Sequence, residues 1–146
     1  MGRSLRGRPR RYVLDANALV GFFEGYAPAA QRVLHLLTEA AVNELPLLMS
    51  AVNWGETFYV EWRYGGEAKA HTAESRLQTL PILVIAADRD RATRAAALKQ
   101  KHGLGYADAF AAELAMERGA WLVTADPEFT KVGKGLSVYW LPRHEE

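Results

Sequence analysis

Five short apolar runs are spaced along the 146-residue chain, with longer segments of helical periodicity between them. Each run is continuously apolar, which is typical of parallel strands covered on both faces. We therefore predict strands at Tyr12–Leu14, Leu47–Ser50, Ile82–Ala86, Trp121–Thr124 and, from a weaker pattern, Ser137–Trp140.

The segments between these runs predict helices. Gly65-Gly66 separates two of them, and Asp88 is placed to cap another. Gly103 and Gly119 are placed to end two more, because glycine accepts the left-handed conformation that follows many helices. The predicted helices are Ala18–Phe23, Ala29–Val42, Ala51–Tyr64, Glu67–Leu80, Arg91–Lys101 and Asp108–Arg118.

Strands that alternate with helices indicate the α/β class. We predict a three-layer α/β/α domain with a central, mostly parallel five-stranded sheet and right-handed crossovers. The length suits one domain with an ordinary core. A content of 49% hydrophobic and 24% charged residues excludes a disordered chain. We assign residues 12–146 to this domain.

Residues 1–11 differ from the rest in charge, since they hold five arginines and no acid. The whole chain has a net charge of +1, but without these five its 13 basic residues face 17 acidic ones, a net of −4. We expect a basic, flexible arm. It is either a solubilising leader or start-site artefact, or a salt-sensitive contact to phosphate.

The chain has no features of a secreted or membrane protein. It lacks cysteine, which excludes disulfides and thiolate metal sites. No apolar run approaches the ~18 residues that cross a bilayer. The basic N-terminus is not followed by the apolar stretch of a signal peptide. We expect a cytoplasmic protein without membrane contact.

Four acidic residues follow apolar runs in four different parts of the chain: Asp15, Glu56, Asp108 and Asp126. Parallel strands present their carboxyl ends at one edge of the sheet, where ligands bind. At an effective dielectric of ~20, two carboxylates ~5 Å apart repel by ~3 kcal/mol. A cluster of this kind requires protons or a hard cation, and oxygen ligands suit Mg²⁺ or Mn²⁺. The sequence therefore predicts a metal-dependent enzyme.

Each acid also has a structural interpretation. Asp108 and Asp126 are suitable helix caps, the latter because Pro127 fits a first helical position. Asp15 suits a turn, and Glu56 suits a solvated helix surface. Four such coincidences at one edge are less probable than one shared site.

Three short motifs and an isolated acid carry a family resemblance: Leu14-Asp15-Ala16-Asn17-Ala18-Leu19, Glu56, Ala107-Asp108-Ala109 and Thr124-Ala125-Asp126-Pro127-Glu128-Phe129. Their order and spacing resemble the PIN-domain ribonucleases, and most of all the VapC toxins of VapBC toxin–antitoxin systems. The resemblance extends from Tyr12 to Leu141. It departs from the common form at Asn17, where serine or threonine is frequent, and in the arginine-rich leader.

The resemblance implies an endoribonuclease in which Asp15, Asp108 and Asp126 hold one or two Mg²⁺ or Mn²⁺ ions. The ion activates a water that hydrolyses a phosphodiester bond in RNA. Glu56 binds metal or orients the water, and Asn17 and Thr124 support the site. Asn53 lies on the same helix face as Glu56, three residues earlier. We expect no role for the four histidines, which show no ligand spacing.

Partners follow from the resemblance and from two surface patterns. Aromatic residues crowd the segment around Glu56 and suit a groove for a partner helix. The family implies a VapB-type antitoxin and a homodimer. Cations along one helical segment could hold the RNA backbone, although an ordinary solvated helix face is the favoured explanation for them: Arg89, Arg91, Arg94, Lys99 and Lys101.

Three other functions fit parts of the pattern. An aspartate-nucleophile phosphatase needs a second aspartate two residues after the first, where this chain has Asn17. A phosphoryl-transfer receiver needs a lysine after a late strand, and Lys131 and Lys134 are poorly placed. The main alternative is a catalytically silent RNA- or protein-binding module of the same fold. Retention of four mutually repelling acids disfavours it.

Overall fold

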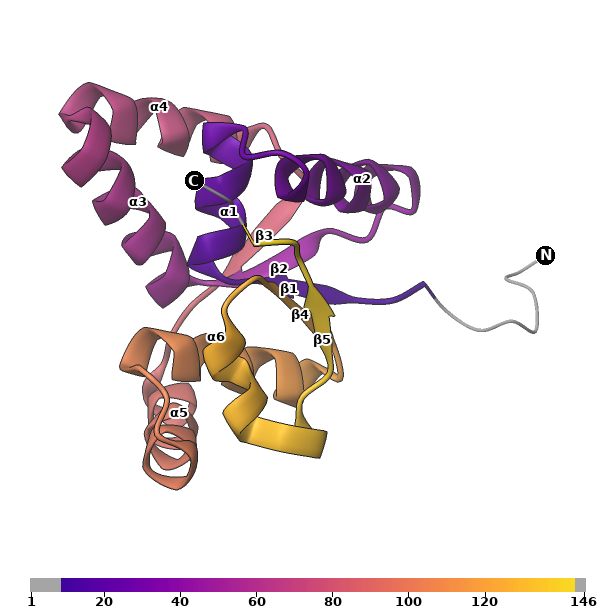
Figure 1. The fold of residues 1–146 in the computed structure, drawn as a ribbon, viewed down its shortest axis with the longest axis vertical. Helices are drawn as coiled ribbons and strands as arrows, with labels where there is room; N and C mark the ends of the chain where they lie inside the picture. The colour runs from indigo at the N-terminus through magenta and orange to yellow at the C-terminus, as the bar shows by residue number, and fades with distance from the viewer. Residues whose placement is uncertain (1–8, 144–146) are drawn as a thin grey trace.

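The computed structural model describes residues 9–143, which fold around one five-stranded sheet (Figure 1). All strand pairs are parallel, in the order β3-β2-β1-β4-β5. The five predicted strands are confirmed; the third ends one residue earlier than predicted and the fifth begins one residue later. Their bounds are β1 (Tyr12–Leu14), β2 (Leu47–Ser50), β3 (Ile82–Ile85), β4 (Trp121–Thr124) and β5 (Val138–Trp140).

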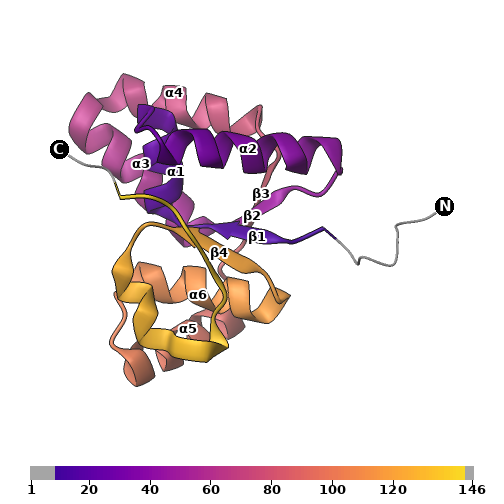
Figure 2. The same cartoon turned by 45° about the vertical axis from the view of Figure 1, so that its right-hand side comes forward.

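Helices cover both faces of the sheet, which confirms the three-layer architecture (Figures 1 and 2). One layer holds α1 (Ala16–Glu24), α2 (Ala29–Val42), α3 (Ala51–Gly65) and α4 (Glu67–Gln78). The other holds α5 (Arg89–His102), α6 (Tyr106–Arg118) and the 3-10 segment η1 (Pro127–Gly135). All six predicted helices are present, whereas η1 was not predicted.

The two layers enclose separate apolar clusters because neighbouring strand residues point to opposite faces. Val13 and Leu122 pack into the cluster around α6. Their neighbours Leu14 and Val123 pack into the cluster built by α1 and α2. This double burial is the reason why the strands read as continuous apolar runs.

The strand order creates a switch point between β1 and β4. From β1 the chain adds β2 and β3 on one side, then crosses to place β4 and β5 on the other. Connections leave β1 and β4 in opposite directions, so a crevice opens at the carboxyl ends of this pair. The backbone N–H of Asp15 still donates to the Val123 carbonyl, at 3.3 Å.

Several predicted helix ends are confirmed. The Asp88 side chain accepts a hydrogen bond from the Arg91 N–H at 2.9 Å and caps α5. Gly103 and Gly119 follow α5 and α6 with φ of 70° and 59°. These left-handed values favour glycine, because a Cβ would clash with the backbone.

The predicted flexible arm falls mainly on residues 1–8, outside the described residues. Arg10 and Arg11, at its end, contact the domain. The Arg10 guanidinium lies 4.2 Å from the centroid of the Trp121 ring. Arg11 Nε donates to the Pro46 carbonyl at 3.3 Å. Within residues 9–143, no helix is both long enough and apolar enough to span a bilayer.

Candidate active site

Asp15 occupies the junction between β1 and α1. It is 3% exposed, and its Oδ1 accepts a hydrogen bond from the Ala18 N–H at 2.8 Å, which caps α1. Its Oδ2 accepts a hydrogen bond of 2.5 Å from the Thr124 hydroxyl. A buried carboxylate held by both oxygens has one fixed orientation at the carboxyl edge of the sheet.

Thr124 connects two of the acids. Its hydroxyl donates to Asp15 and accepts a hydrogen bond from the Asp126 N–H at 3.0 Å. Asp126 then uses Oδ1 to accept from the Glu128 N–H at 2.9 Å, at the start of η1. The cap interpretation is thus correct for Asp126, and the same residue lines the acidic cavity. Capping and a site role do not exclude each other.

Asp108 and Glu56 approach from two further helices. Asp108 is in the first turn of α6 but does not cap it, since the N-cap residue is Gly105. A Cβ at Gly105 would lie 3.2 Å from Asp108 Oδ2, so glycine leaves room for this carboxylate. Glu56 is exposed on α3. Within residues 9–143, neither carboxylate accepts a hydrogen bond, so both can change rotamer.

All four acids line one cavity of about 420 Å³. Its remaining walls come from α1, from α3 and from Tyr26 in the loop after α1. The lining residues are Asp15, Ala16, Asn17, Val20, Gly21, Tyr26, Glu56, Val60, Tyr64, Asp108 and Asp126. The predicted convergence of four distant carboxyl groups on one space is therefore observed.

Burial and, to a smaller extent, neighbouring charges raise the pKa of three carboxyl groups in the cavity. Burial raises the pKa of Asp15 to about 7, with smaller increases from Asp108 and Asp126. Burial, followed by the charges of Asp126, Glu56 and Glu128, raises the pKa of Asp108 to about 6. Partial burial and the charge of Asp126 raise the pKa of Glu56. The site thus holds protons near neutral pH that isolated carboxyl groups would have lost.

The carboxylates line one cavity without forming a finished coordination shell. Within the described part of the chain, no three His, Cys, Asp or Glu side chains lie close enough together to hold a metal ion as they stand. Asp15 and Asp126 are held by hydrogen bonds, whereas Asp108 and Glu56 accept none within residues 9–143.

Two asparagines tie the elements of the site together. Asn17 Oδ1 accepts a hydrogen bond from the Ala125 N–H at 3.2 Å, which links α1 to the segment after β4. Asn53 is fully buried, and its Nδ2 donates to the Ala107 carbonyl at 3.0 Å. It thereby fixes α3 against the residue that precedes Asp108. The buried Oδ1 of Asn53 has no hydrogen-bond partner.

A family comparison accounts for this arrangement. Residues 12–135 match the model of the PIN domain. The chain belongs to the PIN domain family. None of the curated proteins compared with it matches significantly.

Solved structures with the same fold include several VapC and VapBC proteins. The chain of VapBC2 from Rickettsia felis, bound to a promoter DNA fragment, has a TM-score of 0.71 at 18% identity, with 90% of this chain and 98% of that chain covered. VapC20 from Mycobacterium tuberculosis, a Sarcin-Ricin loop cleaving toxin, has 0.68 at 16% identity, with 84% and 95% covered. VapBC-1 from nontypeable Haemophilus influenzae has 0.65 at 22% identity, with 88% and 96% covered. At these identities the likeness shows the shared PIN fold.

The cations expected to bind RNA are not part of the PIN-domain cavity. Arg91 and Arg94 both pair with the buried Glu113, at 3.2 Å and 2.9 Å, and Arg91 also pairs with Glu117 at 3.0 Å. These contacts fasten α5 to α6. Lys99 Nζ donates to the Leu104 carbonyl at 3.0 Å. Only the exposed Arg89 and Lys101 remain without a buried partner, and Arg89 lies 3.9 Å from Asp90.

Sequence reasoning missed the apolar wall of the cavity and one further acid. Val60 and Tyr64 follow Glu56 at helical spacing on α3, a signal that places all three on one face. Glu128 raises the pKa of Asp108 although it points to solvent, and it pairs with Lys131 at 2.5 Å. Its position two residues after Asp126 is the sequence feature that could have placed Glu128 near the site.

Proposed function

We propose that this PIN-domain chain is a metal-dependent endoribonuclease and the toxin of a type II toxin–antitoxin pair. One observation carries the proposal. Four carboxylates from four separate segments line one cavity at the switch point of the sheet. A fold does not gain stability by burying Asp15 where Asp108 and Asp126 raise its pKa. Retention of this arrangement indicates a ligand that needs it.

A hard divalent cation fits the cavity. All acidic side chains in it offer oxygen, and Mg²⁺ and Mn²⁺ prefer oxygen ligands. The raised pKa values of Asp15 and Asp108 measure burial and repulsion that a bound cation would relieve.

Each residue then has a defined part in hydrolysis. When bound, the cation lowers the pKa of a water and stabilises charge on the phosphodiester. Asp15, Asp108 and Asp126 hold it, and the Thr124 hydroxyl keeps Asp15 in one orientation. Glu56, at the exposed side of the cavity, orients the attacking water. Asn17 and Asn53 keep α1, α3 and α6 in register around the carboxylates.

The toxin role has support from the fold and from the surface. Structures that share the fold include VapBC2 from Rickettsia felis, VapBC-1 from nontypeable Haemophilus influenzae and VapC20, a Sarcin-Ricin loop cleaving toxin from Mycobacterium tuberculosis. On this chain, Tyr59, Trp62 and Tyr64 are exposed along α3. We assign this aromatic surface to a VapB-type antitoxin helix, and we expect a homodimer.

The proposal is tested by direct cation binding and by RNA cleavage. Titration calorimetry with Mn²⁺ at pH 7.5 should show binding by the purified protein and at least tenfold weaker binding by Asp108→Asn. RNA cleavage in Mg²⁺ or Mn²⁺ should stop with EDTA and fall by at least ~10²-fold in Asp15→Asn, as for loss of a main electrostatic stabiliser. Expression of the wild-type protein, but not of Asp15→Asn, should arrest growth.

Asp88→Asn is the matched control, because Asp88 caps α5 as Asp15 caps α1 but lies outside the cavity. It should bind Mn²⁺ and cleave RNA like the wild type. Cleavage that persists in EDTA, or an Asp15→Asn protein with near-normal turnover, would contradict the proposal. Binding of RNA without any cleavage would favour the silent module instead.

A further inference from the structure

The side chains that line the acidic cavity cannot by themselves hold a polyanion by charge. None of its lining residues is basic. The predicted cations on α5 are largely occupied, since Arg91 and Arg94 neutralise Glu113. An RNA substrate carries a negative charge on every phosphate, so its attraction to the protein has to come from another surface.

A basic cavity of about 590 Å³ lies at the opposite, amino-terminal edge of the sheet. Its walls come from the start of β1, the end of α2, and the turn between α6 and β4. Three arginines and one glutamate give its lining a formal charge of +2. The lining residues are Pro9, Arg10, Arg11, Asn43, Glu44, Leu45, Arg118, Gly119 and Trp121. Arginines brought together from separate segments of the fold distinguish this cavity from a solvated helix face.

Two of the arginines are fixed by neutral groups and keep their charge uncompensated. Arg10 lies over the Trp121 ring at 4.2 Å. Arg11 uses Nε for the Pro46 carbonyl, at 3.3 Å, which leaves its terminal N–H groups for another acceptor. Within residues 9–143, neither forms an ion pair. Arg118 pairs with Glu117 at 2.9 Å, but that carboxylate is shared with Arg91.

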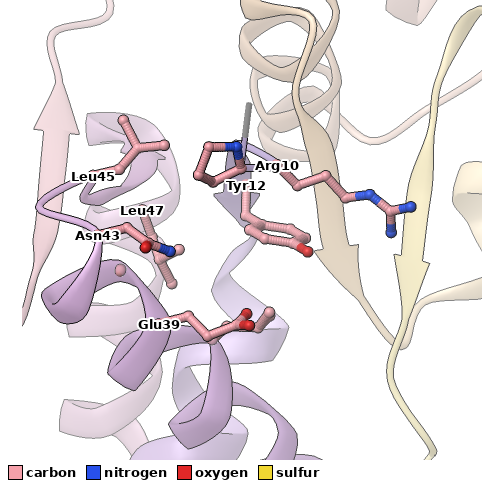
Figure 3. A pocket seen from close by; sticks show the side chains of 9 residues that line it. Arg10, Tyr12, Glu39, Asn43, Leu45 and Leu47 are labelled. Atoms are coloured by element: carbon pink, nitrogen blue, oxygen red, sulfur yellow. The ribbon is translucent and has the colours of Figure 1, made fainter. Parts of the chain in front are cut away.

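The nearest acidic residue of the neighbouring hollow does not neutralise Arg10. That hollow, of about 260 Å³, is lined by Tyr12, Glu39 and Asn43 among others. Figure 3 shows the Arg10 side chain extending away from Glu39, towards β4 and β5. Glu39 instead lies 3.5 Å from His35 on its own helix. Arg10 thus lines both hollows, and its guanidinium points away from the one acid of the smaller hollow.

We propose that this basic cavity binds the phosphate backbone of the RNA substrate. Guanidinium groups match phosphate oxygens in bidentate geometry, and Arg10 is held ready by its aromatic neighbour. The assignment of the ligand as RNA rests on the proposed ribonuclease function. Binding at one edge of the sheet and cleavage at the other require an RNA long enough to reach both, which favours folded RNA over short oligonucleotides.

RNA binding measured in EDTA tests the role of the basic cavity, because metal-dependent cleavage cannot proceed there. A fluorescein-labelled RNA hairpin is titrated with full-length protein by anisotropy, at several KCl concentrations. Each phosphate contact contributes about 0.7 to 0.9 to the slope of log K against log salt, so Arg10→Gln/Arg11→Gln should lower the slope by about 1.4 to 1.8 and the affinity at 0.1 M KCl by about 25- to 60-fold. Removal of the one acid of the lining, in Glu44→Gln, should raise affinity.

Arg89→Gln/Lys101→Gln is the matched control, because it removes the same charge from α5. It should leave affinity within about threefold of the wild type. If it weakens RNA binding as much as Arg10→Gln/Arg11→Gln does, or if Glu44→Gln does not tighten binding, the proposal is overturned. Weakening confined to a duplex DNA of equal length overturns the assignment to RNA.

Circular dichroism and thermal unfolding show whether each variant is folded, and Glu44→Gln gives a gain of affinity that misfolding cannot imitate. Metal-dependent cleavage, measured separately, decides the proposed function. A protein that cleaves RNA but shows no loss of affinity in Arg10→Gln/Arg11→Gln refutes the basic cavity alone. A protein that binds hairpins through the cavity but never cleaves refutes the nuclease alone.

Discussion

Asp15→Asn should make the cation-free protein more stable at alkaline pH while abolishing its activity. Asp15 is 3% exposed, and burial raises its pKa from 3.8 to about 7. One pKa unit corresponds to about 1.4 kcal/mol, so ionised Asp15 lowers the free energy of unfolding by about 4 kcal/mol at pH 8. Asparagine carries no charge and therefore avoids this cost.

Part of this gain in stability is offset, because Asp15→Asn also loses the hydrogen bond from Thr124. The asparagine oxygen can still accept from the Ala18 N–H, but its amide nitrogen cannot accept the Thr124 hydroxyl proton. Losing that bond costs about 1 kcal/mol, which leaves a net gain of about 3 kcal/mol. With an unfolding entropy of about 2.1 cal/mol/K per residue, a chain of 146 residues should gain about 10 °C in Tm.

Whether Asp15→Asn is more or less stable than the wild type depends on pH. Because the folded-state pKa of Asp15 is raised, the wild type loses stability as pH rises from about 4 to 7. At pH 4 Asp15 is protonated in the folded protein and the charge cost is small, so Asp15→Asn should be the less stable protein, by less than about 1 kcal/mol, because of the lost hydrogen bond. At pH 8 it should be the more stable protein. The difference therefore changes sign between these values.

Thermal unfolding in EDTA at pH 4, 6 and 8 measures this difference. The control Asp88→Asn changes an exposed cap of the same geometry and should cost about 1 kcal/mol or less at every pH. A Tm of Asp15→Asn equal to or below that of the wild type at pH 8 would refute the argument that a strained, buried charge is kept for function.

Two further predictions concern the neighbours of the site. Thr124→Val removes the hydroxyl between Asp15 and the Asp126 N–H and should lower RNA cleavage ~10–100-fold, whereas Thr124→Ser should retain most of it in the same assay. Equal activity of the two variants would exclude an orienting role for the hydroxyl. Burial, together with a hydrogen bond to Glu24, raises the pKa of Glu61 to about 7. The wild type should therefore lose stability between about pH 4.5 and 7, and Glu61→Gln should show a flatter Tm profile there; parallel profiles would contradict this.

The local structure could largely be predicted from residue patterns. Continuous apolar runs predicted all five strands, and Asp88, Gly103 and Gly119 predicted helix ends that the structure confirms. These features depend on a few neighbouring residues, so the sequence contains their causes. The segment η1 was missed because it consists of short 3-10 turns with a kink at Gly133, where φ is 77°.

The four acids could be named from the sequence because each follows an apolar run, and parallel strands share one carboxyl edge. The hydrogen bonds that hold the side chains of the site could not be predicted from the sequence. The Thr124 hydroxyl reaches Asp15 across 109 positions, and Asn53 reaches Ala107 across 54. The ion pairs of Arg91 and Arg94 could not be predicted for the same reason, since Glu113 lies on another helix.

The sequence by itself determined the elements, the parallel sheet and the identity of the acidic residues, because these follow from burial and from the geometry of neighbouring residues. Only the tertiary structure decided which charges are neutralised and which stay free. Electrostatic energies fall with distance and depend on burial, so they are set by partners far apart in the chain. Arg10 and Arg91 are both surface arginines in the sequence, yet an aromatic ring holds one and a buried carboxylate neutralises the other.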